Sequence, residues 1–249
     1  MQAMIFAAGL GTRLKPLTDT MPKALVSVGG EPLIRRVLQR LADAGVGRVV
    51  VNVHHFASQI TQYLSENNNF GLDIAISDET EGLLETGGGI KHAARLFDAG
   101  SPVLIHNVDI LSNVNLRKFY NIAAESEVAA IPVDAVLLVS WRKTKRYLLF
   151  NDDMRLVGWT NIETGEVKSP YPELDPRKCR MYAFAGIHVI SPRMFPLMDA
   201  FPEKFSIIDF YLKTCATHNI KGYVKDDLKL MDIGKLDTLA QAETFLSEL

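Results

Sequence analysis

The sequence predicts an α/β fold in which a mostly parallel sheet is covered by helices on both faces. The chain has 249 residues, 47% of them hydrophobic, which is enough for one large domain with a substantial core. Short apolar runs alternate with amphipathic segments along its first half, and the run at 49–53 is β-branched, as is typical of a buried parallel strand. We therefore expect a single domain over residues 1–249, with one half over about 1–133 and a smaller, mixed half over about 134–249.

The first half is expected to alternate strands with helices. Strands are predicted at 3–7, 49–53, 74–77, 103–105 and 128–131, and helices at 32–44, 58–66, 90–96 and 116–124. In the first of these helices leucine and valine recur on one side, and Gly45 supplies the stop. Such alternation implies βαβ units and a mostly parallel sheet.

The second half changes character. A hairpin is predicted from two short strands at 146–150 and 155–159, because they flank a turn of asparagine and aspartate. A proline-rich loop at 169–176 precedes the remaining elements. They are a strand at 182–190, helices at 192–198 and 207–217, strands at 220–224 and 229–231, and a final helix at 237–249.

Composition excludes several classes of protein. The formal net charge of −2 gives no sign of a nucleic-acid partner or a basic membrane surface. No apolar run approaches the roughly 20 residues of a membrane span, and we expect no secretory leader. Cys179 and Cys215 have neither paired nor metal-type spacing, which favours reduced thiols and a cytoplasmic location. The oligomeric state is left open.

The start of the chain carries a phosphate-binding pattern. A predicted strand ends in small residues, and two glycines and two cations follow: Ala7, Ala8, Gly9, Gly11, Thr12, Arg13 and Lys23. Glycines let the backbone approach a ligand, its amides can hold phosphate oxygens, and the cations can donate to them. No Walker A sequence occurs, and Leu14 stands where a dinucleotide fingerprint needs a third glycine. The pattern therefore favours the triphosphate of a nucleotide over a structural turn.

Two further places can carry chemistry. Three consecutive glycines follow Glu85 and Thr86 at the expected opening of a helix, where backbone can approach a flat or charged ligand. Asp109 follows a predicted strand, and an acidic residue at this end of an open α/β sheet faces the ligand crevice. Mg²⁺ is usually held by one or two carboxylates plus substrate phosphates. The alternative for the three glycines is a flexible turn, and the alternative for Asp109 is a helix cap.

The amino-terminal string, from Ala7 to Arg13 and on to Lys23, resembles the signature of sugar-phosphate nucleotidyltransferases. Enzymes of this family join a nucleoside triphosphate to a sugar 1-phosphate and release pyrophosphate. The resemblance covers nearly the whole chain. It implies a Rossmann-like nucleotide-diphospho-sugar transferase fold, a nucleotide half, a sugar half, and a cleft between them.

The same resemblance implies roles for individual residues. Arg13, Lys23 and Asp109 would be catalytic, and Asp109 and Asp232 would bind Mg²⁺ although 123 positions separate them. The nucleotide would contact the amino-terminal residues named above, and also Glu85, Thr86, Gly88 and Asn107. Val108 replaces the glycine that is usual in the family, and its larger side chain would tighten the space beside the ribose.

The sugar site is less completely matched. Gly186 lies in a small-residue segment that resembles the one beside the sugar in the family. The Glu-Lys-Pro of relatives is replaced by a stretch that ends in Asn161, so its two charged residues have no counterpart. Gly186 and Asn161 are therefore the predicted sugar residues. Arg146 and Lys168 are possible replacements, although such charges are more often simply solvated.

The resemblance leaves the base and the acceptor open. The Glu-Thr-Gly-Gly-Gly form at residue 85 resembles the branch that includes uridylyltransferases for N-acetylmuramic acid 1-phosphate, which favours UTP and a hexose 1-phosphate. Guanylyl transfer to mannose 1-phosphate and cytidylyl transfer to phosphocholine are alternatives. A catalytically inactive nucleotide-sugar-binding protein is a further one, although Arg13, Lys23 and both aspartates are retained.

Overall fold

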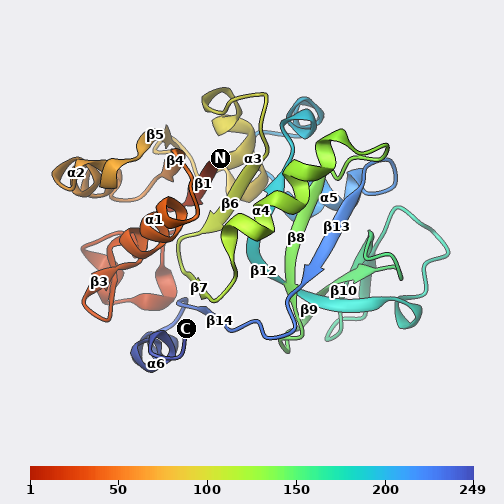
Figure 1. The fold of residues 1–249 in the computed structure, drawn as a ribbon. Coiled ribbons are helices and arrows are strands. Elements are labelled where there is room, and N and C mark those ends of the chain that lie inside the picture. Colours follow the sequence, from red (N-terminus) through yellow and green to blue (C-terminus); the bar gives the residue numbers. More distant parts are fainter.

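The computed structural model describes residues 1–249, with the side chain of Val128 outside the described part. A ten-stranded sheet runs through both predicted halves (Figure 1). Its first part consists of four parallel strands in the order β6-β1-β4-β5. Their bounds are β1 (Gln2–Phe6), β4 (Arg48–Val53), β5 (Asp73–Asp78) and β6 (Val103–Asn107). Parallel pairing aligns the carboxyl ends of these strands along one edge, where ligands bind in open α/β sheets.

The second part of the sheet is built on one long strand, β12 (Arg180–Ile190). Its last residues pair antiparallel with both β6 and β8, while its first residues pair with β9. Gly186 has a φ of 74°, and the register with β8 shifts around it, so the strand bends there. The remaining strands of this part are β8 (Ala135–Ser140), β9 (Arg146–Phe150), β10 (Leu156–Asn161), β11 (Glu166–Lys168) and β13 (Ile220–Val224).

Helices cover both faces of the sheet, as predicted. Alternate residues of β1 point to opposite faces: Ala3 and Ile5 join one buried cluster, and Met4 joins the other. The first cluster includes α1 (Leu33–Asp43), α2 (Ala57–Glu66) and α4 (Leu116–Ala124), and the second includes α3 (Glu85–Ala93) and α5 (Ile207–Thr214). This arrangement and the four parallel strands confirm the predicted fold class.

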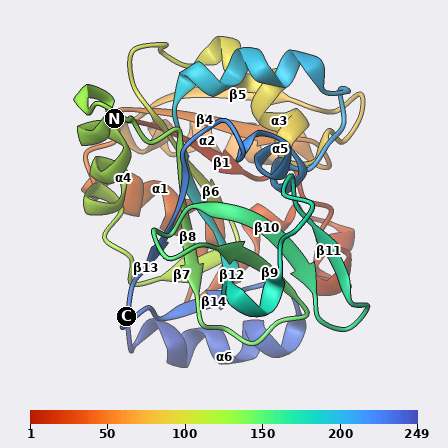
Figure 2. The same ribbon diagram turned by 90° about the vertical axis from the view of Figure 1, so that its right-hand side faces the viewer.

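A final helix and several short elements complete the fold. The last helix, α6 (Leu236–Leu246), lies along β14 at the end of the chain (Figure 2). The small strands are β2 (Ser27–Val28), β3 (Glu31–Pro32), β7 (Ile110–Ser112) and β14 (Leu230–Asp232). The 3₁₀ helices are η1 (Thr12–Leu14), η2 (Leu17–Asp19), η3 (Lys23–Leu25), η4 (Asn68–Gly71), η5 (Ala94–Leu96), η6 (Glu125–Val128), η7 (Pro176–Lys178) and η8 (Pro192–Ala200).

Two predicted elements are wrong. No strand forms at 128–131, because Ile131 is 72% exposed and Pro132 follows it; β8 begins after the proline and is buried from Ala135 onward. The helix predicted at 90–96 begins at Glu85, so the three glycines lie inside α3 and do not precede it. Glycine has a low helix propensity, and tertiary packing overrides it here.

Three other features bear on the sequence-based expectations. No helix in the described chain is both long and apolar enough to cross a membrane. Cys179 and Cys215 are both free thiols. Cys215 is buried, and burial raises its pKa to about 11.

Two buried histidines predict sensitivity to acid. Burial lowers the pKa of His106 on β6 and of His188 on β12 to about 3. Histidine in an unfolded chain titrates near 6.5, so between about pH 6.5 and 3 unfolding takes up a proton at each site. The stability that the two neutral histidines contribute is fully present above about pH 6.5, their pKa in the unfolded chain, and is lost as the pH falls toward 3. The expected slope is at most about 1.4 kcal/mol per pH unit for each histidine.

Urea unfolding at pH 7 and pH 5 measures this loss. His188→Gln removes one of the two titrating groups. The imidazole that it replaces has its Nδ1 2.7 Å from the hydroxyl of Tyr211. The variant should lose less stability between the two pH values than the native protein does. An unchanged difference would contradict the assignment.

Candidate active site

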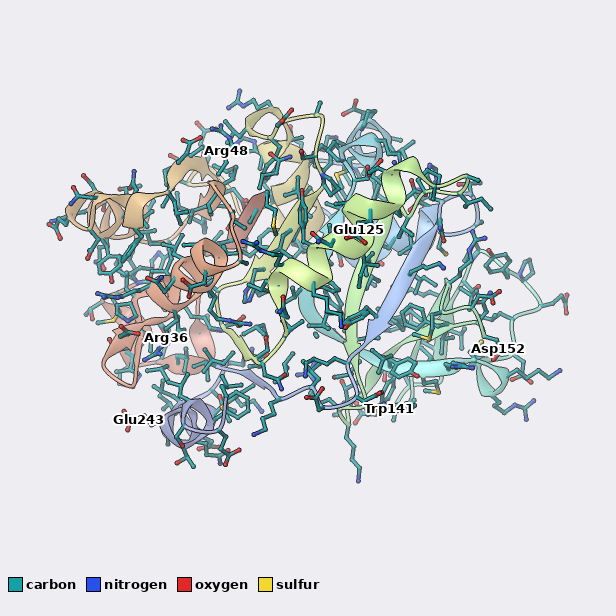
Figure 3. All side chains as sticks on the ribbon, viewed as in Figure 1. Arg36, Arg48, Glu125, Trp141, Asp152 and Glu243 are labelled. Carbon is teal, nitrogen blue, oxygen red and sulfur yellow. The ribbon has the colours of Figure 1, made fainter. Side chains whose placement is uncertain are left out.

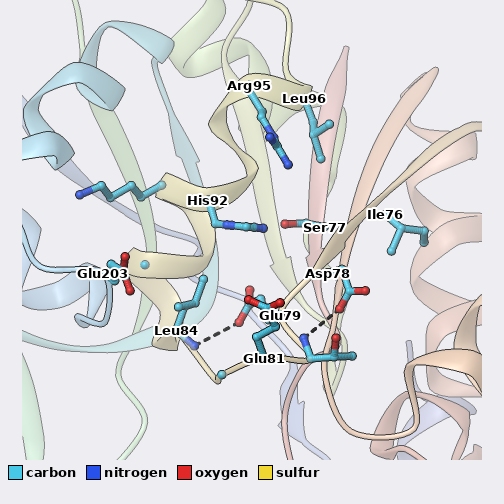
Figure 4. A pocket seen from close by; sticks show the side chains of 14 residues that line it. Ile76, Ser77, Asp78, Glu79, Glu81, Leu84, His92, Arg95, Leu96 and Glu203 are labelled. Carbon is cyan, nitrogen blue, oxygen red and sulfur yellow. Dashed lines mark hydrogen bonds between the residues drawn. The ribbon is translucent and has the colours of Figure 1, made fainter.

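A buried asparagine holds the loop that follows β1. Oδ1 of Asn52 accepts hydrogen bonds from the backbone amides of Ala7 at 2.7 Å and Ala8 at 3.2 Å. Its Nδ2 donates to Oε1 of Glu79 at 2.8 Å, and Oε2 of Glu79 accepts from the amide of Leu84 at 3.2 Å (Figure 4). Both side chains are almost fully buried, so losing one partner would leave the other unpaired at substantial cost. Sequence analysis missed this network; its one signal was a polar residue inside the apolar run of β4.

The glycine loop folds back onto the segment that carries Lys23. Gly11 has a φ of 64°, a left-handed conformation that glycine adopts without strain. The hydroxyl of Thr18 donates to the Gly11 carbonyl at 2.8 Å. A β-carbon on Gly11 would lie 2.8 Å from Thr18 and 3.1 Å from Cβ of Lys23, so the close approach of the two segments requires glycine. Arg13 in η1 and Lys23 in η3 are placed by short turns of this one loop.

Asp109 reaches the same place from β6. The strand ends at Asn107, and Asp109 stands two residues later, just before β7. Lys23 donates a charge-assisted hydrogen bond from Nζ to Oδ2 of Asp109. The exposed fractions of the two side chains are only 10% and 18%, so water screens their attraction less than it screens that of an exposed pair.

Asp232 arrives through a two-stranded ladder at the end of the chain. β14 pairs antiparallel with β7, and the register sets Asp232 opposite Ile110. The amide of Ile233 donates to the carbonyl of Asp109 at 2.9 Å. Two aspartates that are distant in the sequence are thereby anchored on adjacent backbone.

The electrostatics of Asp232 reflect this placement. Burial, and then the negative charge of Asp109, raises the pKa of Asp232, while the cations Lys23, Arg13 and Arg142 act in the opposite direction. Its Oδ1 is buried without a hydrogen-bond partner among the described residues. An unpaired polar atom in the interior is costly, so a cationic ligand at this oxygen would relieve an existing penalty.

Arg13 approaches the same aspartate across a glycine. A β-carbon on Gly234 would lie 2.7 Å from a guanidinium nitrogen of Arg13 and 2.8 Å from Oδ1 of Asp232. The absence of a side chain at Gly234 therefore allows Arg13 and Asp232 to converge. The structure thus brings together four of the predicted residues: Arg13, Lys23, Asp109 and Asp232.

The carboxylate oxygens of Asp109 and Asp232 suit a hard divalent cation that also contacts phosphate. Among the residues that the structure describes, no cluster of three or more His, Cys, Asp and Glu side chains could enclose a metal. Mg²⁺ does not need such an enclosure, since it commonly takes one or two carboxylates, water and substrate phosphates. The pair Asp109 and Asp232, with the open Oδ1 of Asp232, fits that description.

A cavity of about 250 Å³ opens beside these charges. Eight of the predicted catalytic and nucleotide-binding residues line it: Ala7, Ala8, Gly9, Lys23, Glu85, Thr86, Asn107 and Asp109. Val108 also lines it, in the position where the family usually has glycine. Asn52 and Glu79, which the sequence analysis did not propose, complete the wall together with apolar residues.

Gly88 does not line this cavity. It lies on the wall of a larger cavity of about 820 Å³, which shares Glu79 with the smaller one (Figure 4). A β-carbon on Gly88 would come within 2.1 Å of the carbonyl oxygen of Glu203. The amides of Gly87 and Gly88 also donate to the carbonyl of Phe205, at 2.9 and 3.2 Å. These glycines therefore allow α3 to pack tightly against the segment before α5.

A third cavity, of about 510 Å³, lies between the strands β9 to β11 and α5. Asn161 lines it, as do Arg146 and Lys168. Gly186 does not; a β-carbon there would lie 2.8 Å from Nδ2 of Asn107, so Gly186 adjoins the nucleotide side. The two predicted sugar residues therefore lie in different places, Asn161 in this cavity and Gly186 beside Asn107.

Comparison with known proteins identifies the family. Residues 2–248 match the family described as nucleotidyl transferase. The chain belongs to this family. An N-acetylmuramate alpha-1-phosphate uridylyltransferase from Caulobacter vibrioides is 34% identical over 254 residues, which cover 99% of this chain and 97% of the relative. A mannose-1-phosphate guanyltransferase from Kluyveromyces lactis is 26% identical over 260 residues, which cover 100% of this chain and 66% of the relative.

Solved structures agree on the fold. A UDP-glucose pyrophosphorylase complexed with UDP-glucose matches with a TM-score of 0.77 at 15% sequence identity, over 99% of this chain and 98% of that chain. At such low identity the match shows the fold alone, which is the predicted one. The family match and the relatives establish that the protein is an enzyme of the sugar 1-phosphate nucleotidyltransferase type, as the amino-terminal string predicted.

The packing of α3 gives a testable prediction. Gly88→Ala should lower the free energy of unfolding by about 1–3 kcal/mol, because the new methyl group must displace backbone atoms of a neighbouring segment. Gly82→Ala is the matched control, since no atom lies within 4 Å of a β-carbon at that position. Urea unfolding of both variants measures the difference. Equal stability of the two would show that α3 has room to shift.

Proposed function

We propose that the protein transfers the uridylyl group of UTP to a hexose 1-phosphate and releases pyrophosphate. The observation that carries this proposal is the convergence of Arg13, Lys23, Asp109 and Asp232 beside the cavity at the end of β1. The choice of base is supported by the relative from Caulobacter vibrioides, a uridylyltransferase that matches over nearly the full length of both chains. We also propose a cytoplasmic location, where two free cysteines remain reduced.

The reaction needs no side-chain nucleophile. A phosphate oxygen of the sugar 1-phosphate attacks the α-phosphorus, a new P–O bond forms, and the bond to the bridging oxygen of pyrophosphate breaks. The attacking oxygen is already anionic, so catalysis consists of positioning the reactants and stabilising the developing charge. The amides of Gly11 and Thr12 and the guanidinium of Arg13 would hold the departing phosphates. Lys23 would bind the α-phosphate.

Asp109 and Asp232 would hold Mg²⁺, and the unpaired Oδ1 of Asp232 would be one ligand. When bound, the ion would supply positive charge that offsets the negative charge of the reacting phosphates. Lys23 donates to Oδ2 of Asp109. We expect Lys23 to exchange this partner for the α-phosphate, while the β7–β14 ladder keeps both carboxylates in place.

Guanylyl transfer to mannose 1-phosphate is the second candidate. The guanyltransferase from Kluyveromyces lactis matches the whole of this chain, although at the lower identity of 26%. An inactive binding protein would have no need for two cations and two carboxylates that converge on one point.

The first test is Mg²⁺-dependent release of pyrophosphate from each common nucleoside triphosphate with each of a panel of sugar 1-phosphates and phosphocholine. We expect UTP with a hexose 1-phosphate to give the highest rate. A higher rate with GTP and mannose 1-phosphate would select the second candidate. Nucleotide binding without pyrophosphate release from any pair would contradict a transferase.

Substitutions test the assigned roles. Asp109→Asn and Arg13→Ala should each lower kcat about 100- to 1000-fold, because each removes a charge that stabilises the transition state. Lys15→Ala is the control, since Lys15 lies in the same loop but pairs with Asp19 on the surface. Near-full turnover by either active-site variant would make the assignment wrong.

A further inference from the structure

Two buried polar side chains join segments on opposite sides of the nucleotide cavity. Asn52 lies near the carboxyl end of β4, whose first residue, Arg48, marks the other end of the strand in Figure 3. Glu79 follows the last residue of β5, the neighbouring parallel strand. The exposed fractions of Asn52 and Glu79 are 1% and 3%, and both residues line the cavity of about 250 Å³. Neither residue takes part in the proposed transfer step.

Three backbone amides donate to this pair. Oδ1 of Asn52 accepts from the amides of Ala7 and Ala8. Oε2 of Glu79 accepts from the amide of Leu84 (Figure 4). A backbone amide can only donate, so each outer end of the pair must present an acceptor. Between the two side chains, Nδ2 of Asn52 donates to Oε1 of Glu79 at 2.8 Å, so one side chain must supply a donor there.

The three positions together require one carboxamide and one carboxylate. Two carboxamides would leave two donors facing each other at one position, whichever way the amide groups are turned. Two carboxylates would place two acceptors and two negative charges against each other at the centre. The reversed order, with the carboxylate on β4 and the carboxamide after β5, would satisfy every position as the native order does.

The pair connects the loop that follows β1 with the start of α3. Both segments line the nucleotide cavity, the first through Ala8 and the second through Thr86. The helix also packs directly on the pair: a β-carbon on Gly89 would lie 2.8 Å from Oε1 of Glu79 and 3.4 Å from Nδ2 of Asn52. The buried hydrogen bonds therefore fix the separation of the two segments across the cavity.

We propose that Asn52 and Glu79 are positioning residues, whose hydrogen-bond pattern holds the loop after β1 and the start of α3 at the separation that binds the nucleoside triphosphate. This inference rests on the proposed function and adds two residues that act through the backbone of the binding segments. Loss of the pattern should weaken nucleotide binding. It should leave binding of the sugar 1-phosphate unchanged, since neither residue lines the cavity between β9, β10, β11 and α5.

The test exchanges the two functional groups. Asn52→Asp and Glu79→Gln change the shape of each side chain little, and each alone creates a mismatched pair. The double variant Asn52→Asp/Glu79→Gln restores one carboxylate and one carboxamide in the reversed order. Calorimetry with Mg²⁺ gives Kd for the nucleoside triphosphate that the panel assay selects, expected to be UTP. Pyrophosphate release at saturating nucleotide gives KM for the hexose 1-phosphate.

Each single variant should raise Kd for the nucleotide about 10- to 100-fold, as expected when a buried group loses its partner, with KM for the sugar 1-phosphate unchanged. The double variant should recover most of the lost affinity. Ser77→Ala is the matched control: Ser77 is a buried polar residue of β5 whose hydroxyl has no hydrogen-bond partner among the described residues. Its Kd should equal that of the native protein.

Several outcomes would overturn the inference and leave the transferase intact. They are a native Kd in both single variants, equal losses for both substrates, and a double variant that binds nucleotide no better than the weaker single variant. Urea unfolding checks each variant, and a double variant that does not fold would also overturn the inference. A single variant that does not fold agrees with it only if the double variant folds and binds nucleotide. Folded native protein that releases no pyrophosphate with any pair of substrates would overturn the proposed function and the inference together.

Discussion

The candidate site depends on one short antiparallel ladder. β7 follows Asp109 directly, β14 ends in Asp232, and their pairing is continued by the bond from the Ile233 amide to the Asp109 carbonyl. Backbone bonds of this kind fix relative position more firmly than side-chain contacts do. Through them a segment at the end of the chain completes a site that begins at the first strand, and α6 packs beside the ladder.

The ladder places the half-buried carboxylate of Asp232 beside that of Asp109, and this proximity of two negative charges is unfavourable by itself. Its cost is visible in the raised pKa of Asp232 and in the buried, unpaired Oδ1. Lys23 and Arg13 offset part of the repulsion. An arrangement that the fold tolerates only with compensation of this kind is typical of a functional site, since a cation and phosphates can remove the remaining penalty.

A second structural constraint is the long strand β12, which links the two parts of the sheet. β12 pairs with β6 near its end and with β9 near its start, so a single strand carries the chain from the nucleotide cavity to the cavity between β9, β10, β11 and α5. It bends at Gly186, where the lack of a side chain lets Asn107 approach. The bend in β12 therefore sets where the two cavities lie relative to each other.

The sequence by itself determined the local part of this picture. The parallel strands, most helices, the glycine loop with Arg13 and Lys23, and the aspartate after β6 follow from hydrophobic periodicity and from residue types with narrow conformational or chemical uses. These signals act within a few residues, so a linear reading captures them. The same local reading misplaced a strand at 128–131 and began α3 too late, because burial decided both cases.

Only the tertiary structure decided the contacts between distant segments. It joined Asp232 to Asp109 through β7 and β14, and it revealed the buried network of Asn52 and Glu79. It also separated Gly186 from Asn161 and showed that Arg146 lacks an acidic partner among the described residues while Lys168 has two. Such facts depend on strand register and on which side chains share a cavity. Neither is encoded in the spacing of residues along the chain, since both arise only when the sheet has assembled.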